Sequence, residues 1–233
     1  RTPVYIAAQV GQEDAIRALA ELGADVNTPM EDGRTPVYIA AQEGHVDVIR
    51  ALAELGANIH MQDEDGCCPV YVAALEGQVD AIRALAELGA DVNAPDKIGA
   101  SPVFSAAGTN SVTAIRALAE LGANVNTPTE DGRTPVFIAA QKGQVDAIRA
   151  LAELGADVNT PMEDGRTPVY IAAQVGQEDA IRALAEHGAD INTPQCHGRT
   201  PIFIAAMEGQ VRVIRVLAEL GANIHMPSEG GCS

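Results

Sequence analysis

Apolar and polar positions follow one another in a fixed order along the chain, and residues 34–66 show that order. Thr35 precedes Pro36, and this pair suits the start of a helix. The Thr hydroxyl can accept a hydrogen bond from the first turn, and proline already has a helical φ. Gly44 follows eight residues after Pro36, and glycine readily adopts the left-handed conformation that ends many helices. The pattern therefore predicts a short first helix that stops at Gly44.

A second apolar cluster, from about Val46 to Leu55, repeats at helical spacing. Its apolar stripe consists of Val46, Ile49, Leu52 and Ala53. Asp47 suits the positive first turn of such a helix, and Gly56 suits its end. Side chains then alternate over residues 57–60, and Glu64-Asp65-Gly66 is typical of a turn. The predicted unit is therefore two helices followed by a projecting hairpin loop.

The same order of residues recurs every 33 positions without insertion or deletion. The repeats cover residues 1–33, 34–66, 67–99, 100–132, 133–165, 166–198 and 199–231, and residues 232–233 match the start of an eighth. Neither predicted helix reaches the roughly 12–15 residues that an isolated helix needs to persist in water. Each repeat therefore depends on its neighbours for burial. The small side chains of Ala40 and Ala41 would let the first helix approach the next repeat closely.

Less common residues show a second, longer period. Residues 58–61 (Asn-Ile-His-Met) reappear at 223–226, five repeats later, which we interpret as duplication of a five-repeat block. The ends lack the polar outer face that terminal repeats of such arrays normally have. The first repeat, for example, has the apolar side chains of Val4, Ile6, Ile16 and Leu19. We expect a fragment of a longer array, with weak end-to-end self-association through uncapped terminal repeats.

The Thr-Pro start, the Ala-Ala pair and the Gly-Ala-Asp-Val-Asn segment after the second helix together resemble the ankyrin repeat. The resemblance covers residues 1–231, which we interpret as a single ankyrin-repeat domain. It implies an all-α, ankyrin-type helix-turn-helix solenoid with short projecting β-hairpin loops. The family usually has His two residues after the Pro, and this chain has an aromatic residue there instead. An aromatic row would replace the hydrogen bonds of that His. The row consists of Tyr5, Tyr38, Tyr71, Phe104, Phe137, Tyr170 and Phe203.

One loop position carries a polar side chain in every complete repeat. Asn27, Asn93, Asn126, Asn159 and Asn192 occupy it in five repeats, and His60 and His225 occupy it in the other two. Such a side chain can hydrogen-bond to nearby backbone groups. We expect both the asparagines and the histidines to brace the loop in this way. The resemblance also implies that this Asn or His can be hydroxylated by an oxygen-dependent enzyme.

The chain is acidic: 15 Lys and Arg residues stand against 32 Asp and Glu residues, a net charge of −17. This balance nearly excludes a nucleic-acid binder and favours a basic protein partner at long range. No apolar stretch approaches the about 18 residues of a membrane helix, and no leader is recognisable. Only four cysteines are present, too few for a disulfide scaffold. We therefore expect a cytoplasmic location, with the nucleus not excluded.

Side chains that could carry chemistry do not form a recognisable catalytic or metal-binding pattern. Cys67 and Cys68 are adjacent and far from Cys196, and Cys196 is one repeat from Cys232. We expect free thiols. Cys196, His197 and His187 form the least improbable metal group, but zinc-ligand spacing is absent. Ser101, Ser105 and Ser111 lie in a repeat without a histidine, and no nucleotide-binding motif occurs. We expect no enzyme activity, no cofactor and no metal.

A partner-binding site is implied by the resemblance, because ankyrin-like solenoids form a concave surface from loop tips and the exposed side of the first helix. Mapped onto this chain, the predicted partner-binding residues are Tyr38, Gln42, Glu43, Asp65, Cys67, Tyr71, Leu75, Glu76, Lys97, Ile98, Ala100, Phe104, Thr109, Arg133, Phe137 and Lys142. In the third and fourth repeats several of these residues replace polar majority residues or lie next to such replacements, which gives a less charged stretch near the middle, as binding-site cores tend to be. They are Cys67, Leu75, Ile98, Ala100, Phe104 and Thr109. Drift in a dispensable repeat explains the same difference.

Three functions remain open at this point. The first is a non-catalytic protein–protein interaction scaffold that binds a protein on the concave face. The second is a structural spacer or elastic rod within a larger multidomain protein. The third is an engineered or family-averaged repeat array, which would also explain the near-identical repeats and missing caps. Acidity by itself names no partner.

Overall fold

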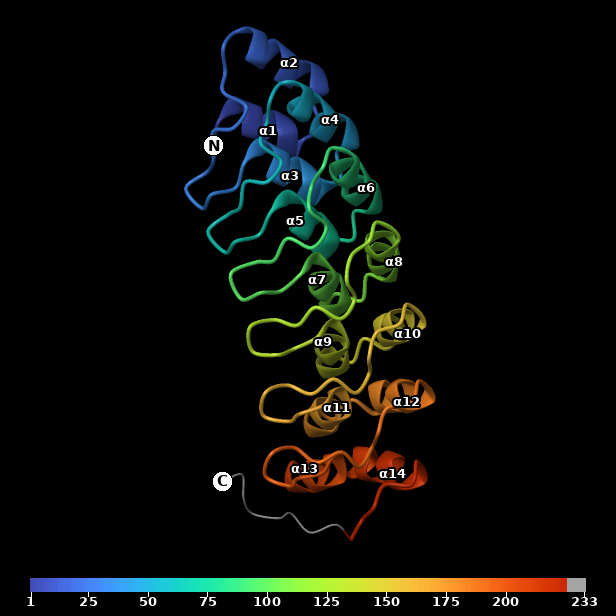
Figure 1. The fold of residues 1–233 in the computed structure, drawn as a ribbon. Helices are drawn as coiled ribbons and strands as arrows, with labels where there is room; N and C mark the ends of the chain where they lie inside the picture. The colour runs from blue at the N-terminus through green and yellow to red at the C-terminus, as the bar shows by residue number, and fades with distance from the viewer. Residues whose placement is uncertain (226–233) are drawn as a thin grey trace. The chain divides into compact units, whose positions relative to one another are not determined.

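The computed structural model describes residues 1–225, and this part of the chain is all-helical, with no strand (Figure 1). First helices begin at Pro3, Pro36, Pro69, Pro102, Pro135, Pro168 and Pro201, at intervals of 33 residues. The helices are α1 (Pro3–Gln9), α2 (Glu13–Glu21), α3 (Pro36–Glu43), α4 (Val46–Glu54), α5 (Pro69–Leu75), α6 (Val79–Glu87), α7 (Pro102–Gly108), α8 (Val112–Glu120), α9 (Pro135–Lys142), α10 (Val145–Glu153), α11 (Pro168–Val175), α12 (Glu178–Glu186), α13 (Pro201–Met207) and α14 (Val211–Glu219).

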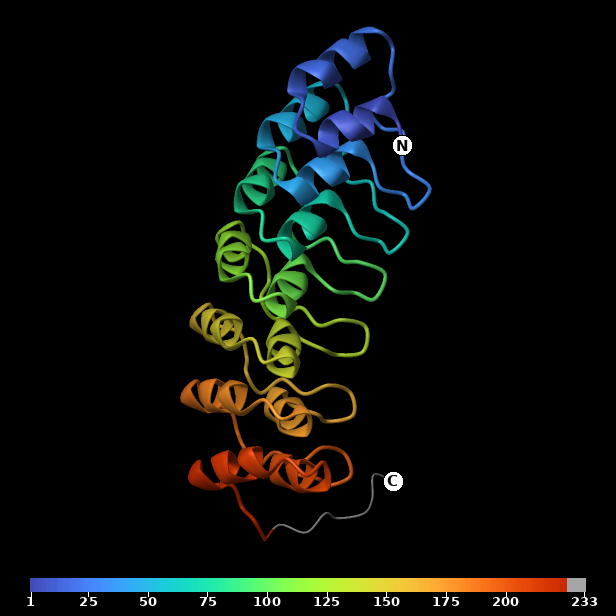
Figure 2. The same ribbon diagram turned by 180° about the vertical axis from the view of Figure 1, so that it is seen from behind.

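The chain falls into two compact units. Unit 1 comprises residues 1–106 and 113–124, and unit 2 comprises residues 107–112 and those from 125 onward. Within each unit the odd-numbered helices lie between the loops on one side and the even-numbered helices on the other (Figures 1 and 2). Consecutive first helices pack side by side, as α1, α3 and α5 do in unit 1. Each unit is therefore a stack of helix pairs.

The start and end of the first helix follow the sequence pattern. In α3 the Thr35 hydroxyl accepts a hydrogen bond from the Tyr38 N–H at 3.3 Å, and Pro36 is the first helical residue. Gly44 ends the helix with a φ of 77°, a conformation that only glycine adopts without strain. These contacts confirm the predicted first helix and its stop.

One first helix lacks this cap. Cys68 precedes α5 and forms no side-chain hydrogen bond to the first turn. Because a Thr hydroxyl there would accept the Tyr71 N–H, we expect Cys68→Thr to raise the free energy of unfolding by about 1 kcal/mol. Thr35→Ala is the matched opposite change and is expected to cost about as much. Urea unfolding followed by circular dichroism measures both, and a Cys68→Thr variant less stable than wild type would contradict the prediction.

The second helix begins and ends as predicted, but its buried face differs from the expected stripe. The buried residues of α4 are Val48, Ile49, Ala51 and Leu52. Val46 and Ala53, which the pattern placed in the core, are only half-buried. Helix α4 packs against α2 and α6 as well as α3. Because three helices surround it, its buried face is wider than the single stripe that the sequence pattern predicted and points in a different direction.

Repeats are joined by small side chains and by side-chain hydrogen bonds. Ala40 and Ala41 are fully buried, as the close approach of α3 to its neighbours requires. Gln78 donates from Nε2 to the Gln42 carbonyl at 3.2 Å, a link between consecutive repeats. On the second helices, Nη2 of Arg50 lies 2.6 Å from Oε2 of Glu87. Burial supplies most of the stability of the stack, because ion pairs this exposed contribute little.

The projecting loops are turns. In the first loop the Met30 N–H donates to the Arg34 carbonyl at 2.8 Å, and the Gly33 N–H donates to the Met30 carbonyl at 3.0 Å. These bonds close a hairpin-like loop without strand pairing in the described residues. The predicted alternation at residues 57–60 is present, since Ile59 is buried while Asn58 and His60 are exposed.

The asparagine loop position forms the expected braces, but His60 does not. Asn159 donates from Nδ2 to the Gly188 carbonyl at 3.2 Å and accepts the Asp190 N–H at 2.8 Å. In the described part of the chain neither the His60 imidazole nor the Asp91 N–H at the equivalent junction forms a hydrogen bond. The expectation that His60 braces its loop is therefore wrong. An imidazole cannot present a donor and an acceptor side by side as an amide does.

The first repeat buries only part of its apolar surface. Val4 and Ile16 are buried, while Ile6 and Leu22 are exposed. These exposed side chains are compatible with the expected self-association, which stays a prediction. The start of an eighth repeat at residues 232–233 lies outside the described residues, and the single-domain interpretation also remains a prediction.

Candidate functional site

The predicted partner-binding residues divide into three groups by exposure. The exposed ones are Glu43, Asp65, Leu75, Glu76, Lys97, Ile98, Thr109 and Lys142. The half-buried ones are Gln42, Cys67, Tyr71 and Arg133. The buried ones are Tyr38, Ala100, Phe104 and Phe137. Thr109, Arg133, Phe137 and Lys142 belong to unit 2, and the rest belong to unit 1. The exposed group therefore supplies most of the surface that a partner could contact in either unit.

The aromatic row contributes mainly to the core. Phe137 is only 2% exposed, and Tyr38 and Phe104 are also buried. Tyr71 is half-buried, and its hydroxyl donates to the Asp96 carboxylate at 3.1 Å. Burial of an aromatic ring stabilises a fold strongly. These side chains hold the first helices in place beneath the loops and leave little area for a partner.

Burial of the tyrosines also predicts how their hydroxyl groups ionise at high pH. Desolvation raises the pKa of all four, Tyr5, Tyr38, Tyr71 and Tyr170, above the usual value. The folded state then retains phenolic protons that the unfolded state loses above about pH 10. The tyrosine contribution to stability is therefore fully present below that pH and is lost as pH rises through the folded-state pKa. The chain has no Trp, so absorbance at 295 nm reports tyrosinate cleanly.

We expect less tyrosinate signal near pH 10 in the folded protein than in urea, where all four tyrosines should share a midpoint near pH 10. Most of the native signal should appear at higher pH, together with loss of helical circular dichroism. Ionisation of all four tyrosines near pH 10 with the helices intact would contradict the burial of their hydroxyls.

Three loop tips tie an acid to an arginine. Asp32 and Arg34 are joined at 2.8 Å between Oδ2 and Nε, and Arg166 pairs with Asp164 at 2.7 Å in the same way. Asp131 and Arg133 form the third pair. The hydrogen bond from Arg34 lowers the pKa of Asp32. Such tips carry a counter-ion for one of their two acids, and the neighbouring Glu remains as a negative charge.

The loop tips of the second and third repeats are built differently. Asp63 accepts the N–H groups of Asp65 and Cys67 at 3.0 and 2.9 Å. Asp96 accepts those of Ile98 and Ala100 at 2.9 and 2.8 Å. The carboxylates of Asp63 and Asp96 therefore each stabilise the loop tip that contains them. Sequence reasoning missed both, although the signal was visible: they occupy the position of Met30, Thr129 and Met162 in other repeats.

Neighbouring tips in unit 1 are joined edge to edge. The Glu64 N–H donates to the Asp32 carbonyl at 2.9 Å, and the Lys97 N–H donates to the Asp65 carbonyl at 3.0 Å. This approach requires Gly66, because a Cβ there would lie 2.7 Å from the Lys97 nitrogen. The tips thus form one continuous edge of unit 1.

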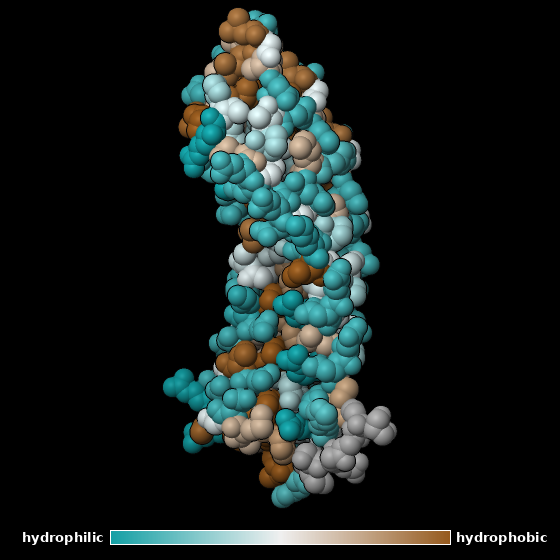
Figure 3. Space-filling model, turned by 90° about the vertical axis from the view of Figure 1, so that its left-hand side faces the viewer, coloured by the Kyte–Doolittle hydropathy of each residue, from teal (hydrophilic) through white to brown (hydrophobic). Residues whose placement is uncertain are grey.

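A surface pocket of about 340 Å³ lies along this edge. Its lining residues are Asp32, Arg34, Tyr38, Asp63, Glu64 and Asp65. Four carboxylates against one guanidinium make the pocket negative. Figure 3, which views the side with the loops, shows mostly hydrophilic side chains with hydrophobic ones in separate patches.

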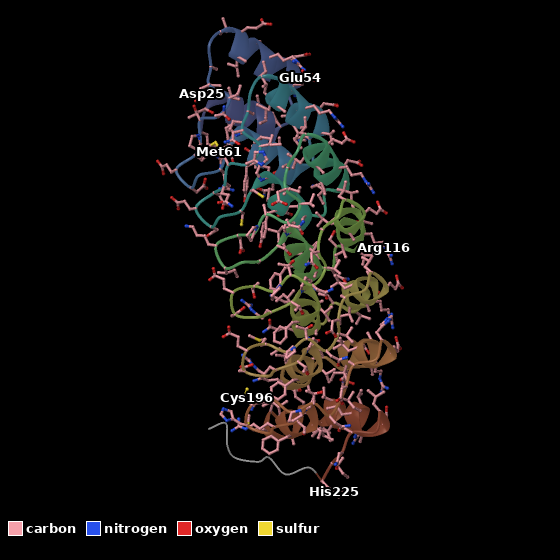
Figure 4. The ribbon with its side chains drawn as sticks, in the orientation of Figure 1. Asp25, Glu54, Met61, Arg116, Cys196 and His225 are labelled. Carbon is pink, nitrogen blue, oxygen red and sulfur yellow. The ribbon has the colours of Figure 1, made fainter. Side chains whose placement is uncertain are left out.

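The cysteines that the structure describes form no disulfide, as the sequence interpretation expected. Cys67 is half-buried, Cys68 is buried and Cys196 is exposed on a loop (Figure 4). Burial, with the nearby Asp63 and Asp96, raises the pKa of the Cys67 thiol to about 12. Such a thiol is a poor nucleophile at neutral pH. Cys232 lies outside the described residues.

In the described part of the chain, no group of three or more His, Cys, Asp or Glu side chains could hold a metal ion, so Cys196, His197 and His187 do not meet in one. Among residues 1–225, no helix is both long and apolar enough to span a bilayer.

Comparison with known proteins now identifies the class. A family model described as ankyrin repeats (3 copies) matches residues 4–96, 71–162 and 159–228. The chain therefore belongs to the ankyrin repeat family. Among solved structures, it is similar to the crystal structure of the human ASB11 ankyrin repeat domain, with a TM-score of 0.82 and 26% sequence identity. The match covers 96% of this chain and 99% of that one. No match was found among curated proteins.

The match confirms the predicted all-α ankyrin-type solenoid. Members of this family are generally protein-interaction modules and are generally non-catalytic.

Proposed function

We propose that the chain is a non-catalytic scaffold that binds a protein partner through its loop tips and the exposed ends of its first helices. One observation carries the proposal. Side chains that hold the repeats together are repeated nearly unchanged, as the fully buried Ala40-Ala41 and Ala139-Ala140 pairs are. Exposed side chains at the ends of the first helices differ instead. At one such position they are Val10, Glu43, Glu76, Thr109, Lys142, Val175 and Glu208.

Repeat-to-repeat variation at such exposed positions is what a binding surface requires, because recognition depends on exposed anchors. The net charge of −17 favours a basic partner by accelerating encounter. The near-identical loop tips, such as those at Arg34 and Arg166, then form the common framework of the binding surface, and the divergent residues determine which partner binds.

The two lysines of the chain provide a direct test, because Lys97 and Lys142 are both exposed at predicted partner-binding positions. Proteins captured by the immobilised chain would be identified, purified and returned to it. Acetylation with and without the partner, read by mass spectrometry, is expected to show protection of at least one lysine. The α-amine of Arg1 is the internal control. Full reactivity of both lysines in a saturated complex would contradict the proposed surface.

A spacer role is the second candidate, and one observation favours it. Ion pairs recur at the same separation along the second helices within each unit. They are Arg17–Glu54, Arg50–Glu87 and Arg83–Glu120 in unit 1 and Arg149–Glu186 and Arg182–Glu219 in unit 2. Figure 4 shows Glu54 at the end of α4, on the side away from the loops. A chain that captures no protein but refolds reversibly under repeated stretching would favour the spacer.

A further inference from the structure

The third repeat exposes two apolar side chains at positions that are polar elsewhere. Leu75, the last residue of α5, is 38% exposed, and Ile98, at a loop tip, is 49% exposed. Four other repeats have Gln at the position of Leu75: Gln9, Gln42, Gln141 and Gln174. Four have Asp at the position of Ile98: Asp32, Asp65, Asp131 and Asp164. Each leaves more than a third of its surface in contact with water, so burial within the stack accounts for only part of these apolar side chains.

Both residues belong to unit 1, Ile98 on the continuous edge of loop tips and Leu75 at the end of the helix that follows one of these tips. The tip at residues 63–67 leads directly into α5, which ends at Leu75. The same tip is joined to the tip at residues 96–100 by the hydrogen bond from the Lys97 N–H to the Asp65 carbonyl. We call residues 63–67, Leu75, Glu76 and 96–100 the third-repeat surface.

The charge of this surface is unbalanced because one arginine is missing. Cys67 stands where Arg34, Arg133, Arg166 and Arg199 stand in other repeats. Asp63, Asp65 and Asp96 all act on the Cys67 thiol, so three carboxylates lie close to it. Glu64 and Asp65 are exposed and form no ion pair among the described residues. Lys97 provides the one positive charge on the third-repeat surface.

We propose that the third-repeat surface binds a polypeptide segment in which Lys or Arg residues flank an apolar side chain. The apolar side chain packs against Ile98 and Leu75, and the cations lie against Glu64, Asp65 and Glu76. Charge complementarity selects this occupant, since an acidic segment, a nucleic acid or an anionic lipid surface is repelled by the same carboxylates. The inference rests on the proposed function and names the chemistry of the partner.

The chain supplies its own variants for the test. Leu75→Gln, Ile98→Asp and Cys67→Arg each install the residue that other repeats carry at the same position, so each is expected to fold. Leu22→His is the matched control: Leu22 is 87% exposed at the end of α2, away from the first helices and loop tips, and His187 occupies the same position in another repeat. Thermal unfolding by circular dichroism checks that all four variants fold.

The probe is a random dodecapeptide library displayed on phage and selected on the immobilised full chain. We expect enriched peptides to carry an apolar residue flanked by Lys or Arg. Their Kd, measured by fluorescence anisotropy, should rise about tenfold or more with Ile98→Asp or Cys67→Arg and less than about twofold with Leu22→His. Raising NaCl from about 0.05 to 0.25 M should also weaken binding, because exposed charge pairs are screened.

This inference would be overturned if the enriched peptides lacked basic residues, or if their Kd were the same for Ile98→Asp and Cys67→Arg as for the wild type. Either result would leave the proposed function standing. Enrichment of no peptide would also reject the inference. Failure of the proposed function would show separately, as unprotected Lys97 and Lys142 in a saturated complex with a captured protein.

Discussion

Phe137→Ala is expected to lower the free energy of unfolding by about 3–5 kcal/mol, the usual cost of emptying a phenylalanine site in a core. Phe137 is 2% exposed and lies in the first turns of α9. Its backbone N–H is already bound to the Thr134 hydroxyl at 3.2 Å, so the substitution leaves the helix cap intact. The loss would therefore report packing alone. Urea unfolding, fitted to a model in which each repeat is coupled to its neighbours, measures the loss of unfolding free energy.

The result also decides what the aromatic row does. Leu22→Ala is the control, because Leu22 is 87% exposed and its truncation should change stability by less than about 0.5 kcal/mol. If Phe137→Ala were as mild as Leu22→Ala, Phe137 would not be a core residue, and its predicted role as a partner contact would regain support.

His60→Asn is expected to raise the free energy of unfolding by about 1–2 kcal/mol. The amide would supply the two hydrogen bonds that Asn159 forms with the Gly188 carbonyl and the Asp190 N–H, each contributing about 1 kcal/mol. Asn159→His is the reverse change. It is expected to cost about 1–3 kcal/mol, because it removes both bonds.

Hydrogen exchange locates the effect at a single amide. The Asp190 N–H is bonded in the wild type and should exchange slowly, whereas the Asp91 N–H is not bonded and should exchange fast. His60→Asn should slow exchange at Asp91 and leave the Asn58 amide, already bonded to Asn27, unchanged. Unaltered exchange at Asp91 would show that the amide does not bridge this junction.

Local sequence rules predicted most of the helical framework. Thr35, Pro36 and Gly44 act through backbone geometry and hydrogen bonds within one turn, so their effect can be read without knowing the neighbours. The family could be recognised for the same reason, since each repeat contains the full set of such signals. Val46 and Ala53 were misplaced because α4 contacts several helices, and a pattern along one helix does not show how many neighbours surround it.

The candidate site was predicted less completely. Lys97 and Ile98 are exposed as expected, whereas Tyr38 and Phe137 are buried, because an aromatic side chain at the start of a first helix packs beneath the loop. Asp63 and Asp96 were missed, since their partners lie in the folded loop and, for Asp96, on α5.

The order of residues by itself determined the period, the helix ends and the ankyrin class, because these depend on backbone preferences that act over a few residues. Only the tertiary structure decided which junctions are bridged by an amide, which acids are paired, and which apolar side chains of the third repeat stay exposed. Those outcomes depend on which groups meet between repeats about 33 residues apart, and a hydrogen bond forms only where donor and acceptor come within about 3 Å.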